Sequence, residues 1–426
     1  MNVQNRLVTA DLTRRAELVA AIAAAAADEV DRAPKFPAEA IAAARAQRLL
    51  GILVPAELGG EEASVSDVVD VCYALGRACA STGMIYAMHQ MMVAALVRHA
   101  GGSAWHRRLL RRIGEEQLLL ASSTTEGQGG GDLRKSSCAV ERRDARMSLE
   151  KSATVISYGT EADVLLTTAR RAPDSPPTDQ VLVALAADDY RLEPLVGWDT
   201  LGMRGTCSRG FMLRAEGESG QVLPDAYHKV HTETVMPVAH LAWSAVWAGI
   251  AAAAVERARV FVRKAAGKSG TPPGAQHFTR AGATLSSLRW MIGSALRRYE
   301  TAKSDPRDLE SLDFQTSMNL LKVNASEMAI ATVTSALQAC GLAGYRNDGE
   351  FSIGRHLRDV LSSSIMINND RILANVATTS FLVDVPAFLT DQPRRREANI
   401  AVEADTGTGE LAHLKRDGFS ANRHPA

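Results

Sequence analysis

The spacing of apolar residues indicates helices from residue 10 to about residue 117. Apolar positions there recur every three or four residues, which is the period of one helix face. We expect one helix around residues 18–31 and a second over residues 38–50. Ser64 and Asp67 have the spacing of a capping box, so a further helix is predicted to begin at this pair.

Between about residues 118 and 223 the pattern changes to short apolar or alternating runs separated by turn-forming clusters. Such runs are typical of strands. No ten-residue helical pattern joins one run to the next, so a small antiparallel barrel or sandwich is favoured over a parallel sheet with crossover helices. The runs are residues 118–122, 153–157, 164–169, 181–186 and 210–213.

Helical periodicity returns near residue 235 and continues to about residue 389. The predicted fold class is therefore α+β and mostly α, with the strands in the middle of the chain. We divide the chain into an N-terminal helical domain, a small antiparallel β-barrel or sandwich, a C-terminal four-helix bundle and a polar, loosely ordered tail. Their predicted bounds are residues 1–117, 118–232, 233–390 and 391–426.

Charge and cysteine content limit the classes of partner and the cellular location that we expect. Lysine plus arginine equals aspartate plus glutamate, at 48 each, so no net field attracts nucleic acid or an anionic membrane. The most apolar run, residues 240–255, is short for a membrane span and is typical of a buried helix. Five cysteines in 426 residues do not form a disulfide framework. We expect a soluble, cytoplasmic protein without nucleic-acid or membrane partners.

Common catalytic and metal-binding motifs are missing from the sequence. There is no HExxH, no CxxC and no GxSxG, so no metal site is predicted and no nucleophile elbow supports a serine triad. The glycine run at residues 127–131 lacks the full GxGxxG spacing and does not lie in a βαβ unit. By itself this run is a flexible turn.

Several short segments, taken together in their order, resemble the acyl-CoA dehydrogenase family. The resemblance extends over about residues 50–385, and it rests on order and spacing because no single motif is specific. It implies a helix–β–helix architecture, a bound FAD and assembly as a homodimer or homotetramer. The segments are residues 51–60, 80–83, 125–132, 157–159, 201–206, 338–344 and 358–359.

The resemblance also implies which residues hold the flavin. The loop that begins at Thr125 and the turn at Ser157 match segments that contact the isoalloxazine ring, which makes Thr125, the backbone of Glu126 and Ser157 the candidates. Alignment from the start of the strand would place Val155 at the hydroxyl position. Counting back from residues 162–163 selects Ser157, which alone of the two has a hydroxyl.

A second segment resembles the part of the family that meets FAD across a dimer interface. It contains Gln338, Gly341 and Gly344, which the resemblance assigns to the adenosine and pyrophosphate. Glycines allow backbone N–H groups to approach an anion closely. The simple alternative for Gln338 is a solvated polar group on a helix.

Dehydrogenase members need a carboxylate that removes the α-proton while hydride leaves for the flavin. Counting back eight residues from Arg358 gives Glu350 as the catalytic base, whereas counting forward from residues 344–345 gives Asp348. Glu350 is preferred because the helix it precedes fixes its position better than the loop does. A carboxylate favoured by the helix dipole is the alternative for Glu350. The position where other members carry the base is Ala242.

The sequence departs from the family pattern at two places, one near the expected pyrophosphate contact and one near the expected flavin and substrate contacts. The Arg-x-x-Phe-Gly signature is missing, and one of the nearby cations Arg263, Lys264 and Lys268 is expected to serve the pyrophosphate, without a choice among them. Residues 367–370 replace the usual Glu-Gly-Thr stretch. Trp243 and Trp247, four residues apart on one helix face, either line an acyl pocket or pack in the core.

The leading functional hypothesis is FAD-dependent α,β-dehydrogenation of an acyl thioester, bound to coenzyme A or to a carrier protein. The electrons would pass to an electron-transfer flavoprotein or to oxygen. A rival is a flavin-dependent monooxygenase on the same fold, which acts on an amine, a sulfur or an aromatic substrate and typically lacks the carboxylate base. A flavin-free scaffold is the third possibility.

Overall fold

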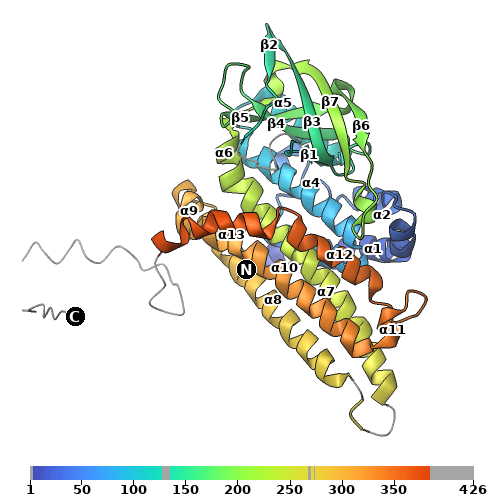
Figure 1. Cartoon of the computed structure of the whole chain (residues 1–426). Coiled ribbons are helices and arrows are strands. Elements are labelled where there is room, and N and C mark those ends of the chain that lie inside the picture. Colours follow the sequence, from blue (N-terminus) through green and yellow to red (C-terminus); the bar gives the residue numbers. More distant parts are fainter. Residues whose placement is uncertain (1–2, 127–134, 267–269, 273, 384–426) are drawn as a thin grey trace, which may run out of the picture. The chain divides into compact units, whose positions relative to one another are not determined.

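The computed structural model describes residues 3–126, 135–266, 270–272 and 274–383. The chain through Val383 forms one compact unit. Figure 1 shows its helices and its two sheets. The glycine run expected at residues 127–131, the candidate cation Lys268 and the polar tail expected from residue 391 lie outside the described residues.

The N-terminal part is helical, as the apolar spacing predicts. The predicted capping box is confirmed at the start of α3, where the Ser64 hydroxyl accepts the Asp67 N–H and the Asp67 carboxylate accepts the Ser64 N–H at 2.9 Å. α4 is buried along nearly its whole length and contacts both the strands and the later helices. The helices are α1 (Val3–Arg32), α2 (Ala38–Ala46), α3 (Val65–Ala78), α4 (Ala80–His99) and α5 (Ala104–Glu116).

The middle of the chain forms two four-stranded sheets, with strand orders β1-β4-β5-β8 and β2-β3-β7-β6. All pairs between named strands are antiparallel except β1 with β4, where Leu120 lies beside Val164 in parallel register, so the antiparallel prediction is wrong for this one pair. The chain visits β2 and β3 in the other sheet between these two strands, which lets it return in the same direction without a crossover helix. The strands are β1 (Leu120–Ser123), β2 (Glu141–Arg143), β3 (Arg146–Ile156), β4 (Val164–Arg170), β5 (Gln180–Ala186), β6 (Tyr190–Val196), β7 (Arg209–Glu218) and β8 (Val222–Ala226).

The last part of the described chain is again helical. α7, α8 and α10 pack together, and α12 crosses α7 and α10 (Figure 1). α3 lies along α7. Two glycines allow α3 and α7 to approach closely: a Cβ on Gly76 would lie 2.5 Å from the Val246 carbonyl oxygen, and one on Gly249 would lie 2.4 Å from that of Tyr73. The helices are α6 (Tyr227–Val230), the π-helical turn η5 (His231–Val235), α7 (Met236–Ala266), α8 (Ala275–Ala302), α9 (Pro306–Glu310), α10 (Leu312–Cys340), α11 (Leu342–Tyr345), α12 (Gly354–Ile365) and α13 (Asn369–Ala377).

Two helical stretches are long and apolar enough to cross a membrane by length and composition alone. They are Ala80–His99 and Tyr227–Ala266, and 94% and 89% of their most apolar windows are buried inside the protein. Packing against other elements accounts for their apolar character. The fold class predicted from the sequence, helical with a small β-part in the middle, is confirmed.

Candidate active site

A cavity lies where the ends of β1 and β3 meet α4, η5 and α7. It brings Thr125 and Ser157 together, although 32 residues separate them in the sequence. Its volume is about 150 Å³, below the usual range for a whole small-molecule site. The lining residues are Met88, Met91, Ser122, Thr124, Thr125, Val155, Ser157, Tyr227, His231, Val235, Met236, Ala239, His240, Trp243, Met366 and Ile367.

Hydroxyl groups form one edge of this cavity. The Thr125 hydroxyl donates to the Val155 carbonyl oxygen at 3.4 Å. The Ser157 oxygen lies 2.8 Å from the hydroxyl oxygen of Ser208, which is buried behind it. The turn at Ser157 is fixed by the next residue: Tyr158 has a positive φ of 40°, and its hydroxyl donates to the Leu120 carbonyl oxygen at 2.9 Å. These contacts hold the hydroxyl edge in place before any ligand binds.

The opposite wall is apolar and is built largely from α4 and α7. Met236, His240 and Trp243 share one face of α7 because they lie four and three residues apart. The indole nitrogen of Trp243 is buried without a hydrogen-bond partner, so a donor in the wall is unpaired. The indole nitrogen of Trp247 is unpaired as well, but this residue is fully buried in the core, with the Lys322 ammonium 5.7 Å from its ring centre. Of the two tryptophans, only Trp243 lines the cavity.

Two neutral histidines also face this cavity. Burial lowers the pKa of His231 to about 4 and that of His240 to about 3. The His240 Nδ1 lies 2.9 Å from the Met318 carbonyl oxygen and therefore carries the proton. The sequence analysis did not identify either histidine, because no motif surrounds them; the one signal was a histidine at the start of an apolar helical run. Among the described lining residues there is no carboxylate.

The π-helical turn that supplies His231 is held by a buried polar network. His99 lies on α4, with its Nδ1 2.7 Å from the Asp225 carboxylate and its Nε2 2.8 Å from the Thr234 hydroxyl. Burial lowers the pKa of His99 despite the opposing effect of Asp225. The neutral ring therefore donates from Nδ1 and accepts the Thr234 proton at Nε2. A π-helical turn at a functional site is a recurrent feature, and here it aims His231 at the cavity.

The side chain of Glu126 points away from the cavity and into the β-part. Its carboxylate lies 3.5 Å from the buried Lys151 ammonium, accepts the Ser137 N–H at 2.7 Å, and also binds the Ser136 hydroxyl. Burial alone would raise the pKa of this carboxyl, but Lys151 and the serine donors outweigh it and lower the pKa. Glu126 thus anchors the chain beside Thr125, while the expected flavin contact involved only its backbone.

Glu350 does not lie with these residues. Its side chain is 65% exposed, and its carboxylate contacts the Lys264 ammonium at 2.9 and 3.0 Å. Positions 243 and 264 of α7 are 21 residues apart, which corresponds to about 32 Å along the helix axis. Asp348, the alternative from the loop count, is exposed and pairs with Arg346 at 2.7 Å. The geometry therefore argues against either carboxylate as the base for chemistry in this cavity.

The segment expected to meet adenosine and pyrophosphate ends α10, also away from the cavity. Gln338 and Gly341 are exposed, and Gly341 ends the helix with a φ of 54°. Gly344 is buried where a Cβ would come within 2.6 Å of the Cys340 Cβ. The flanking Leu342 and Tyr345 are 74% and 76% exposed. The assignment of this segment to FAD across an interface stays a prediction, and its exposed apolar side chains are compatible with it.

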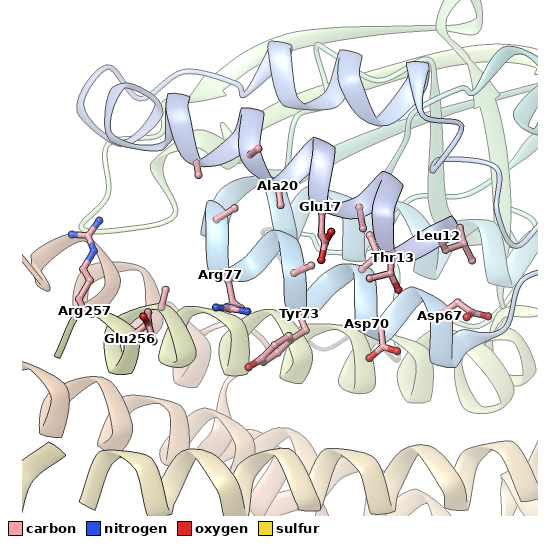
Figure 2. Close-up of a pocket in the computed structure, with 17 residues that line it drawn as sticks. Leu12, Thr13, Glu17, Ala20, Asp67, Asp70, Tyr73, Arg77, Glu256 and Arg257 are labelled. Atoms are coloured by element: carbon pink, nitrogen blue, oxygen red, sulfur yellow. The ribbon is translucent and has the colours of Figure 1, made fainter. Parts of the chain in front are cut away.

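A larger groove, of about 750 Å³, lies between α1, α3 and α7 (Figure 2). Much of its lining is alanine, and charged side chains such as Glu17, Asp70 and Arg77 lie along it. It contains none of the predicted site residues. Within the described part of the chain, no group of three or more histidine, cysteine, aspartate or glutamate side chains is arranged to hold a metal ion. The smaller cavity is therefore the candidate active site.

Two protein-family patterns match the chain. The patterns of "Acyl-CoA dehydrogenase, N-terminal domain" and "Acyl-CoA dehydrogenase, C-terminal domain" match residues 12–117 and 230–378. The 3-sulfinopropanoyl-CoA desulfinase of Paraburkholderia xenovorans is 26% identical over 364 residues, which cover 82% of this chain and 88% of the relative. The L-evernosamine nitrososynthase of a Micromonospora species is 27% identical over 369 residues, 82% of this chain and 84% of the relative.

Solved structures agree on the fold. The dibenzothiophene monooxygenase TdsC from Paenibacillus sp. A11-2 superimposes with a TM-score of 0.76 over 88% of this chain and 98% of that chain. The sequence identity is 18%, so this likeness concerns the fold alone.

Proposed function

Because the chain belongs to the acyl-CoA dehydrogenase family of flavin-dependent enzymes, we propose that it is a flavin-dependent monooxygenase built on that fold. Its substrate class is an amine, a sulfur compound or an aromatic ring. The observation that carries the proposal is the chemistry of the cavity: no carboxylate is found among its described lining residues. The predicted base, Glu350, forms an exposed ion pair instead.

Dehydrogenation of a thioester requires a base within hydrogen-bond reach of the α-carbon. The only titratable imidazoles in the described lining are His231 and His240, and burial lowers both pKa values to about 4 and about 3. A base with so low a pKa is poorly matched to a carbon acid, because proton transfer efficiency follows basicity. Oxygen transfer to a nucleophilic substrate does not need that step.

The residues that line the cavity fit a flavin ring. The hydroxyls of Thr125 and Ser157 offer a polar edge, and Val155 and Trp243 offer apolar walls. A bound flavin supplies the electrons that activate oxygen. The apolar walls exclude water from the flavin. The neutral His231 ring offers one N–H donor and one acceptor nitrogen at the cavity.

We further propose that the cofactor is FAD and that the adenosine end is held by a second copy of the chain. The exposed segment with Gln338, Gly341 and Gly344 is the part that would reach it. This arrangement requires a homodimer or homotetramer. The free, buried cysteines agree with a location in the reducing cytoplasm. NAD(P)H would reduce the flavin, directly or through a reductase. It would replace the acyl thioester as electron donor, and oxygen would replace an electron-transfer flavoprotein as electron acceptor.

One relative supports this function: the nitrososynthase named above, which is 27% identical to this chain, whereas other relatives are acyl-CoA dehydrogenases. The structure of TdsC, which has been crystallised with FMN, agrees in fold alone. The oxygenase reaction is tested by supplying reduced flavin and ¹⁸O₂ to the full-length protein with a panel of amines, thioethers and aromatic compounds. Mass spectrometry of a product should reveal one ¹⁸O atom. Flavin oxidation without any labelled product, together with flavin reduction by an acyl thioester, would instead support the dehydrogenase.

A further inference from the structure

A further pocket, of about 620 Å³, lies where the end of α1, the loop after β6 and the start of α12 meet. It contains none of the candidate flavin or base residues. Arg257 lines it from α7, 14 residues beyond Trp243, which corresponds to about 21 Å along the helix axis, so this pocket is separate from the candidate active site. Five arginines line it: Arg32, Arg204, Arg257, Arg355 and Arg358.

Two of these arginines have ion pairs with exposed carboxylates. The Arg355 Nε lies 3.0 Å from the Asp28 carboxylate but lacks the alignment of a hydrogen bond. Arg204 lies 3.2 Å from the Asp199 carboxylate. The side chains of these two aspartates are 74% and 97% exposed. Exposed ion pairs contribute little free energy, so neither aspartate holds its arginine firmly.

Arg257 has the least compensated charge of the five. Its Nη1 donates to the Ser352 carbonyl oxygen at 2.6 Å, and it forms no ion pair with a carboxylate of the described chain. Burial, and after it the like charge of Arg355, lowers the pKa of Arg257. The same two arginines add to the burial that lowers the pKa of His356. Two guanidinium groups therefore repel each other in a partly desolvated place, and a bound anion would relieve that repulsion.

The charge balance of the pocket favours an anion. Its lining contains five arginines and two aspartates, Asp28 and Asp31, and Asp31 pairs with Arg358. Two more carboxylates lie beside the lining: Asp199, and the buried Asp359, which accepts the Met203 N–H at 2.7 Å. Even with both of them counted, the arginines exceed the carboxylates by one. A positive excess in a pocket attracts and retains anions.

We propose that this pocket binds a small molecule through a phosphate or diphosphate group. Guanidinium forks match the paired oxygens of phosphate groups, and arginines that converge from several elements suit a group with more than one negative charge. The volume lies in the usual range for a small-molecule site, so there is room for more than the phosphate itself. The proposal does not rest on the flavin-dependent function.

Isothermal titration of the full-length protein, as purified and with FAD present, tests the proposal with inorganic phosphate, inorganic pyrophosphate and ADP. Pyrophosphate should bind saturably at one site per chain. Tighter binding of ADP than of pyrophosphate would identify a nucleotide as the source of the group. Equal or weaker binding of ADP would identify the diphosphate group alone as the recognised part.

Arg257→Met and Arg355→Met should each weaken pyrophosphate binding roughly ten- to hundredfold, because each removes hydrogen bonds to a charged group. Arg257→Lys keeps a cation without the fork and should bind with intermediate affinity. Arg259→Met is the matched control from the same helix, since Arg259 pairs with Glu256 and lies outside the lining of the pocket. It should bind pyrophosphate as wild type does.

The absence of saturable binding for all three anions would overturn the proposal. So would unchanged pyrophosphate binding in both Arg257→Met and Arg355→Met. Displacement of FAD by pyrophosphate would also overturn it, because the anion would then belong to the flavin site. Circular dichroism checks that each variant folds, and the two positions give the same test independently. None of these outcomes decides the proposed oxygenase function, which the labelled-oxygen experiment tests separately.

Discussion

The carboxylate of Glu350 lies 2.9 Å from the ammonium of Lys264, at the end of α7 that is remote from Trp243. This pair is exposed, and the cavity lined by Trp243 contains no carboxylate among its described residues. The distance along α7 therefore separates the expected catalytic base from the cavity where the flavin candidates Thr125 and Ser157 lie.

Glu350→Gln is expected to leave both oxygenase activity and stability nearly unchanged. An exposed ion pair of this kind is worth about 0–1 kcal/mol. Urea unfolding gives the stability, and reductase-driven oxygen consumption with an accepted substrate gives the activity. Lys264→Met is the matched control from the other side of the pair. A large loss of activity in Glu350→Gln alone would assign a catalytic role to the carboxylate.

Lys151→Met is expected to destabilise the protein by about 3–5 kcal/mol, because it leaves the buried Glu126 carboxylate without its cation. Lys151 also donates to the carbonyl oxygens of Ser123 and Thr168 at 2.9 and 2.8 Å, so its loss removes two further buried hydrogen bonds. The double variant Lys151→Met with Glu126→Gln should recover part of the loss. Urea unfolding of wild type and of both variants measures the free energy of unfolding. Equal stability of the single and double variants would contradict the account.

The stability of the protein should rise with pH in part because of Lys322. Burial lowers the pKa of this lysine to about 8 from its usual 10.5. Between these two values the unfolded chain binds more protons than the folded one, so the free energy of unfolding increases with pH by at most about 1.4 kcal/mol per unit. Below pH 8 both states are protonated and the slope vanishes. Urea unfolding at several pH values should reveal this rise in wild type and its absence in Lys322→Met.

Trp243→Phe and Trp247→Phe should have different effects, although the residues lie one helical turn apart. Trp243 lines the cavity, so a smaller ring there should weaken flavin or substrate binding roughly three- to tenfold through lost apolar contact. Trp247 is buried in the core against Lys322, so its replacement should lower stability by about 1–3 kcal/mol and leave binding nearly unchanged. Titration with flavin and urea unfolding separate the two effects. An equal loss of binding in both variants would contradict this distinction and show that the two tryptophans have the same role.

The sequence predicts features that depend on neighbours in the chain. The capping box at Ser64 is local, and it forms as expected. β2, β6 and β8 were not predicted, because β2 consists of exposed charged residues, β6 has no fully buried residue and β8 has one. Strands of that kind lack the alternation from which a sequence indicates a sheet.

The candidate site was predictable only in part, because some of its contacts join residues that are distant in the sequence. Thr125 and Ser157 follow strands, and the resemblance to a known family identified both. His231 enters the cavity through a π-helical turn held by His99 from another helix, and no local pattern encodes that contact. The base assignment at Glu350 came from counting along a loop, and a residue count does not give a distance in space.

The most direct test of the central claim is anaerobic mixing of the flavin-loaded full-length enzyme with a panel of acyl-CoAs and acyl-carrier proteins. Without a base in the cavity, no thioester should bleach the flavin absorbance, whereas NAD(P)H or a reductase should. The same panel with Glu350→Gln should give the same result. Bleaching by a thioester in wild type and its loss in Glu350→Gln would contradict the account and establish the dehydrogenase with Glu350 as its base.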